Sequence, residues 1–133
     1  MSGDLITFLR ARLDEDERTA RKAFARPWIR HENVAGVHAG DAGEGLPFGT
    51  AIADCRRVRD GYGVPNADHI ARYDPARVLA EVEAKRQIVD EYEKVAWVMI
   101  PWAIERATAL QVALKALTAA YADHPEYLKE WRS

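Results

Sequence analysis

The sequence lacks most of the features that would place it in a specialised class of protein. Its single cysteine, Cys55, excludes a disulfide within the chain and a metal site built from several cysteines. Its longest uncharged apolar stretch, residues 95–104, is about half a membrane-spanning helix. Lysine and arginine total 19 against 21 acidic residues, and charge is nearly balanced in residues 4–24, 25–74 and 75–133. We therefore expect neither a membrane partner nor a nucleic-acid partner.

What remains is the composition of a globular protein. The hydrophobic share is 48%, and 133 residues suffice for one domain with a core. The acidic N-terminal region, with Asp4 and residues 14–17, predicts neither a secretory signal nor a transit peptide. We expect a single domain over residues 1–133, located in the cytoplasm.

Residues 4–24 are predicted to form an N-terminal helix that begins at the N-cap residue Asp4. Its apolar residues recur at the spacing of one helix face: Leu5, Phe8, Leu9 and Leu13. The pattern changes after residue 24, because six of the eight glycines lie within residues 36–61. Residues 25–65 are predicted to form a small antiparallel hairpin or three-stranded meander. Its expected strands are residues 28–34 and 49–55, with Val37 and His38 in the loop between them and Trp28 as a buried anchor.

Residues 66–122 are predicted to be helical. A short helix capped by Asn66 should end near Tyr73, because Asp74 precedes a proline. Asp74 and Pro75 then form a strong helix start, with Asp74 as the N-cap. No glycine, asparagine or serine occurs in residues 76–132, so Pro101 is the main interruption. We favour one long helix kinked at Pro101; the alternative is a reversal of the chain within residues 97–102. A short helix over residues 123–133 is expected to pack back onto the fold through Tyr127, Leu128 and Trp131.

A continuous helix over residues 75–122 would be about 70 Å long. A compact domain of this size is only roughly 35–40 Å across, so an apolar stripe would be left in water. Exposed apolar surface of that extent usually marks an interface. We therefore predict a homodimer, with one polar seam residue, Lys85, favouring a low oligomer number. The predicted interface consists of Val89, Tyr92, Ala96, Trp97, Met99 and Trp102.

Three groups of polar residues could carry chemistry. Asp14 with Glu17, and Asp90 with Glu93, place carboxylates on one helix face and could hold magnesium. The four histidines and Cys55 lack the spacing of a zinc site. Residues 56–59 (RRVR), followed by Tyr62, could contact phosphates and a base, although Asp54 and Asp60 flank them. For each group a solvated face or ordinary packing is the simpler interpretation. We assign no catalytic, cofactor-binding or metal-ligating residue and no cofactor.

Four segments carry a resemblance that covers nearly the whole chain. They are DLITFLRARLDEDERTAR at residues 4–21, the pair Pro27-Trp28, NADHIARYDPARVLAEVEAKRQIVDEY at residues 66–92 and YADHPEYLKEWR at residues 121–132. Together they resemble a family of small proteins of unknown function common in Streptomyces, other actinobacteria and their phages. More distantly, the tryptophan-bearing strand, the segment NADHIA and the long helix are similar to early accessory proteins of lambda-like phages. Neither resemblance implies a catalytic residue.

The function expected from the sequence is that of a non-enzymatic interaction or accessory module of phage or mobile-element origin. It would act by self-association and by binding another protein. A small metal-dependent nucleotide-processing enzyme is the first alternative, and a nucleic-acid-binding accessory protein is the second. The fold expected is α+β and mainly helical.

Overall fold

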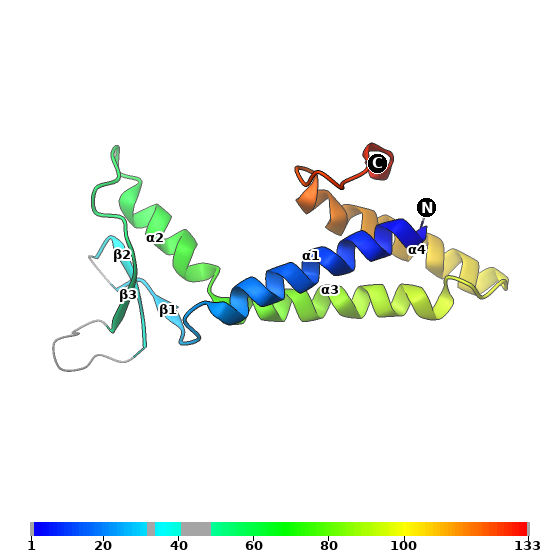
Figure 1. Cartoon of the computed structure of the whole chain (residues 1–133), viewed down its shortest axis with the longest axis horizontal. Helices are drawn as coiled ribbons and strands as arrows, with labels where there is room; N and C mark the ends of the chain where they lie inside the picture. The colour runs from blue at the N-terminus through cyan, green and yellow to red at the C-terminus, as the bar shows by residue number, and fades with distance from the viewer. Residues whose placement is uncertain (1, 32–33, 41–48, 133) are drawn as a thin grey trace. The chain divides into compact units, whose positions relative to one another are not determined.

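A computed structural model describes residues 2–31, 34–40 and 49–132 of the chain (Figure 1). The α-helices are α1 (Ser2–Lys22), α2 (Gly63–Arg72), α3 (Pro75–Val95) and α4 (Pro101–Thr118). The strands are β1 (Trp28–Ile29), β2 (Gly36–Ala39) and β3 (Thr50–Asp54), and the short 3-10 helices are η1 (Ala119–Tyr121) and η2 (Lys129–Trp131). The predicted α+β, mostly helical fold with an N-terminal helix is confirmed, but α1 begins at Ser2, so Asp4 lies in its first turn and is not its N-cap.

The chain divides into two compact units. Residues 1–17 and 81–133 form the helical unit, and residues 18–80 form the sheet unit. Helices α1 and α3 each contribute to both. The single domain predicted over residues 1–133 stays a prediction.

In the helical unit, α1 buries its predicted apolar face through Leu5, Leu9 and Leu13. Helix α4 runs back from the turn that follows α3, and the C-terminal segment lies against the first half of α1 (Figure 1). The Phe8 ring centroid lies 5.0 Å from that of Trp131 and 6.0 Å from that of Tyr127. The predicted packing of these two aromatic residues onto the fold is therefore confirmed. The segment is not a regular helix from Pro125, however, because turns occupy residues 122–126 and only η2 is helical.

The sheet unit contains an antiparallel meander in the order β1-β2-β3. Helix α2 packs on it over a small core of Val37, Cys55 and Ala67. The three-stranded meander is confirmed, but Val37 and His38 lie in its central strand and not in a loop. The predicted first strand is correct for only two residues, and its residues 32–33 lie outside the described ranges, as do residues 41–48 of the predicted loop. Trp28 packs against the core yet is only half-buried, because its indole N–H must reach the Phe24 carbonyl at 3.0 Å.

Helix α2 begins three residues before the predicted N-cap. The Asn66 amide already donates to the Tyr62 carbonyl at 2.9 Å, so Asn66 lies inside the first turn. An early start is compatible with Pro65, because the amides of the first turn have no partner within the helix. Gly63 permits it, since a Cβ there would come within 2.6 Å of the Cys55 carbonyl oxygen. The end of the helix at Arg72 agrees with the prediction.

Asp74 has the geometry of the predicted N-cap of α3. Its Oδ1 accepts a hydrogen bond from the Arg77 amide at 3.0 Å, which is the N-cap to N3 bond. Its other oxygen, Oδ2, accepts one from the Trp28 amide at 3.4 Å. One carboxylate therefore caps a helix and holds the first strand of the sheet unit.

The favoured continuous helix over residues 75–122 is wrong, and the alternative reversal is confirmed. Helix α3 ends at Val95 and α4 begins at Pro101. Steric contact with the proline ring holds Ile100 in an extended conformation (φ −114°, ψ 150°), which ends any helix approaching it. Pro101 then occupies the first turn of α4, where a missing N–H costs nothing. A proline at this place starts a new helix rather than kinking an old one.

Candidate interaction surface

The tip of the α3–α4 hairpin is the most unusual surface of the helical unit. Backbone hydrogen bonds define its turn: the Val98 amide donates to the Val95 carbonyl at 3.1 Å, and the Ile104 amide donates to the Ile100 carbonyl at 3.0 Å. The turn is therefore an ordered reversal, built without glycine.

An ion-pair cluster fastens the two helices below the tip. The Glu91 carboxylate of α3 accepts from Lys94 at 2.5 Å and from Arg106 of α4 at 2.8 Å. The hydrogen bond and charge of Lys94, followed by those of Arg106, hold the pKa of Glu91 below its usual range. Because these groups are solvent-exposed, the cluster fixes the pairing of α3 and α4 more than it adds stability.

Large apolar side chains point into solvent at this tip. Trp97 is 75% exposed, Met99 is 80% exposed and Trp102 is 59% exposed. Ile100 and Ile104 are exposed beside them. We call these five residues the tip patch. Next to it, the surface between α1 and α3 forms a groove whose lining includes Ile6, Ala96 and Trp97 together with the paired Arg10 and Glu93.

The family model that matches the chain spans residues 2–133, and its description is a family of unknown function (DUF6221). The chain belongs to the DUF6221 family. Membership agrees with the expected resemblance to a family without an established function. No curated protein matches the chain, and no solved structure matches it.

In this DUF6221 chain the six predicted interface residues fall into two groups. Val89 and Tyr92 are buried within the helical unit, so they are not part of an exposed stripe. The stripe was expected on the assumption of a continuous helix, whereas the chain reverses at residues 96–100. Ala96, Trp97, Met99 and Trp102 are exposed at the tip. Ile100 and Ile104 were not among the predicted interface residues. Interpreting Pro101 as the start of a new helix would have placed both at the same turn as Trp97 and Met99.

Both carboxylate pairs considered for magnesium are bound by arginine. Arg86 Nη2 lies 2.6 Å from an Asp14 oxygen and 2.7 Å from a Glu17 oxygen. The hydrogen bond from Arg86 to Glu17, followed by the one to Asp14, raises the pKa of Arg86. Arg10 Nη2 lies 2.7 Å from Glu93 and 3.4 Å from Asp90. Each pair therefore links α1 to α3 through a cation that sequence spacing could not identify.

The histidines and Cys55 are dispersed. His31 and His38 have ring centroids 6.0 Å apart in the sheet unit, His69 contacts Tyr73 at the C-terminal end of α2, and His124 contacts Phe8 in the helical unit. Cys55 is buried in the sheet-unit core. Within residues 2–31, 34–40 and 49–132, no three histidine, cysteine or acidic side chains are grouped so that they could hold a metal ion. None of the helices in those ranges combines the length and apolar character needed to cross a membrane.

Proposed function

We propose that this protein is a non-enzymatic interaction module that assembles as a homodimer through the tip patch. The observation that carries the proposal is the exposure of two tryptophans and a methionine at one ordered turn. Tryptophan and methionine are enriched in the buried centres of protein interfaces. These exposed side chains are not part of the core of the helical unit. Burial against a partner is therefore the better explanation for their presence at this turn.

The size of the patch fits one side of a modest dimer interface. Trp97, Met99 and Trp102 together expose on the order of 500 Å². Ile100 and Ile104 extend that area toward the roughly 800 Å² that each partner contributes to a standard interface. The adjoining groove between α1 and α3 offers a recess for an aromatic side chain of the second copy.

A second copy is favoured over a lipid bilayer by the charges around the tip. Asp90, Glu91, Glu93 and Glu105 are set against Lys94 and Arg106, so the surroundings carry no basic excess that would attract an anionic membrane. In a two-fold symmetric dimer, by contrast, the tip patch of one copy would pack against the tip patch of the other. The acidic and basic side chains around the patch could then form ion pairs at the rim of the interface.

The test is the mass of the protein in solution, measured by light scattering during size-exclusion chromatography. We expect wild type to run at twice 15.0 kDa at tens of micromolar. Met99→Glu should convert it to a monomer, because a charge would be buried at the interface. Val112→Glu is the matched control, since Val112 is 66% exposed on α4 but lies outside the patch. It should remain dimeric.

Two results of the mass measurement would contradict the proposal. One is a wild-type protein that runs at 15.0 kDa throughout this concentration range. The other is dissociation by Val112→Glu but not by Met99→Glu, which would place the interface elsewhere. Co-sedimentation with phosphatidylserine vesicles that is lost in Met99→Glu would identify a bilayer as the occupant instead.

The origin of the protein and its further partner belong to the same proposal. The resemblance to actinobacterial and phage proteins supports an accessory role in which the dimer binds another protein. The cytoplasmic location stays a prediction.

A further inference from the structure

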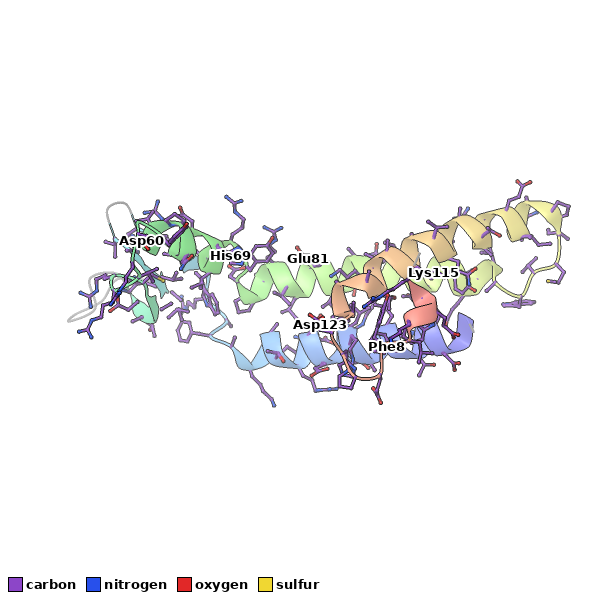
Figure 2. The ribbon with its side chains drawn as sticks, turned by 90° about the horizontal axis from the view of Figure 1, so that it is seen from above. Phe8, Asp60, His69, Glu81, Lys115 and Asp123 are labelled. Carbon is purple, nitrogen blue, oxygen red and sulfur yellow. The ribbon has the colours of Figure 1, made fainter. Side chains whose placement is uncertain are left out.

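The second distinctive surface lies on the sheet unit, along an exposed flank of α2 next to the side that packs on the sheet. Gly63, Ala67 and Ile70 turn toward the sheet. On the neighbouring side, about 100° around the helix from these residues, the spacing of four, three and four residues aligns an exposed row of Tyr62, Asn66, His69 and Tyr73. Figure 2 labels Asp60, in the turn before α2, and His69, near the end of the helix. We call these four residues the α2 row.

Both tyrosines of this row are exposed to solvent. Tyr62 is 61% exposed and Tyr73 is 44% exposed. The His69 and Tyr73 ring centroids lie 4.8 Å apart, and the Arg77 guanidinium lies 4.4 Å from the Tyr73 centroid. The His69 and Tyr73 rings are tilted by 43° relative to each other and Arg77 lies over the Tyr73 ring, so Tyr62 is the more exposed of the two tyrosines.

The charge of the sheet unit has the opposite sign to that of the whole chain. Residues 18–80 contain ten arginine and lysine residues against seven aspartate and glutamate residues, whereas the helical unit contains nine against fourteen. Linear segments hide this difference, because the acidic first part and the basic last part of α1 fall in different units. Our expectation of no nucleic-acid partner was based on three segments of near-neutral charge. Those segments do not coincide with the two compact units of the structure.

Arginines at both ends of the α2 row are available for a ligand. Asp54 is paired with Arg56 at 2.7 Å, and Asp68 is paired with Arg30, so two of the nearby acids are already neutralised. The pairing with Arg56 holds the pKa of Asp54 well below its usual range. Arg59 precedes the row and Arg72 lies beside its end, and neither forms an ion pair with a residue in the described part of the chain.

We propose that the α2 row, with Arg59 and Arg72, binds single-stranded nucleic acid. The chemistry that recognises such a strand is a set of cations for the phosphates and exposed aromatic faces for unpaired bases. From Tyr62 to Tyr73 the row is about 16 Å long, which matches roughly five stacked nucleotides at 3.4 Å each. A duplex is a poorer match, because its bases are already stacked and cannot reach the rings.

The experiment is fluorescence anisotropy with a labelled oligothymidylate of about 20 nucleotides in about 50 mM salt. We expect micromolar binding that weakens as salt rises. Replacing both arginines, Arg59→Gln with Arg72→Gln, should reduce the slope of log K against log salt by about 1.4, or about 0.7 for each phosphate contact. Tyr62→Ala should weaken binding about tenfold through loss of one stacked base, whereas Tyr62→Phe should stay within about twofold.

The matched control is the pair Lys129→Gln with Arg132→Gln, which removes the same charge from exposed positions of the helical unit. It should leave both affinity and salt slope unchanged. The proposal is overturned if wild type gives no anisotropy change at low salt, or if the control pair lowers the slope as much as the arginine pair does. It is also overturned if polyglutamate or the duplex form competes as well as the unlabelled single strand.

Discussion

Replacement of Asp74 tests the link between the start of α3 and the sheet unit. Asp74→Ala removes two hydrogen bonds, one from the Arg77 amide at 3.0 Å and one from the Trp28 amide at 3.4 Å. Loss of an N-cap costs about 1 kcal/mol. The second bond is long, so we assign it about 0.5 kcal/mol. The expected loss in the free energy of unfolding is therefore about 1.5 kcal/mol.

Two further replacements separate these contributions. Asp74→Ser keeps one capping oxygen, so it should recover the N-cap contribution of about 1 kcal/mol. The bond from the Trp28 amide would still be missing, which leaves a deficit of about 0.5 kcal/mol in the free energy of unfolding. Asp74→Asn should behave similarly, because its amide nitrogen cannot accept from the Trp28 amide. Asp123→Ala, at an exposed aspartate, is the control and should change little.

The measurement is urea unfolding followed by helical circular dichroism. An Asp74→Ser variant as unstable as Asp74→Ala would refute the capping argument, and the same holds if Asp74→Ala unfolds at the wild-type urea concentration.

Two other predictions concern close packing and pH. Gly63→Ala should destabilise the protein by about 1–3 kcal/mol in thermal or urea unfolding, because a Cβ would lie 2.6 Å from the Cys55 carbonyl. Gly3→Ala, where a Cβ meets nothing within 4 Å, should be neutral or slightly stabilising, and equal effects at both sites would contradict the packing argument. Tyr121→Phe should cost about 1 kcal/mol at pH 8, since it removes the hydrogen bond to the Asp16 carboxylate at 2.5 Å. Burial, and then that hydrogen bond, raise the pKa of Tyr121, so the wild-type advantage is complete below the ordinary tyrosine pKa of about 10 and should shrink as the pH rises above it. A constant difference between the two proteins up to pH 11 would show that the Tyr121 pKa is not raised.

Local patterns in the sequence predicted those parts of the fold that depend on local chemistry. The apolar face of α1, the Asp74-Pro75 helix start and the end of α2 before a proline all follow from the steric and hydrogen-bonding rules of adjacent residues. The reversal before Pro101 did not follow, because a proline inside an apolar helical pattern either kinks a helix or starts one. The choice between the two depends on which other parts of the chain can bury the apolar residues on either side of the proline.

The same distinction applies to the surfaces. The exposure of Trp97 and Met99 was predicted, although for an incorrect reason, whereas the burial of Val89 depends on which helix covers it. The pairing of Arg10 and Arg86 with acids more than 60 positions away could not be found from spacing. Charge separation between the two units was likewise invisible until the boundaries within α1 and α3 were known.

The helical unit is discontinuous in sequence, and that has a consequence for how the protein could change over evolutionary time. Its two parts end at residues 17 and 81, and Arg86 joins the first part at Glu17 across 2.7 Å. The 63 residues of the sheet unit thus leave and rejoin the helical unit at two positions that this salt bridge holds close together. Closure entropy grows only slowly with the length of an inserted loop. Lengthening, trimming or exchanging the insert would therefore place little strain on the hairpin that carries the tip patch, and the two surfaces could diversify independently.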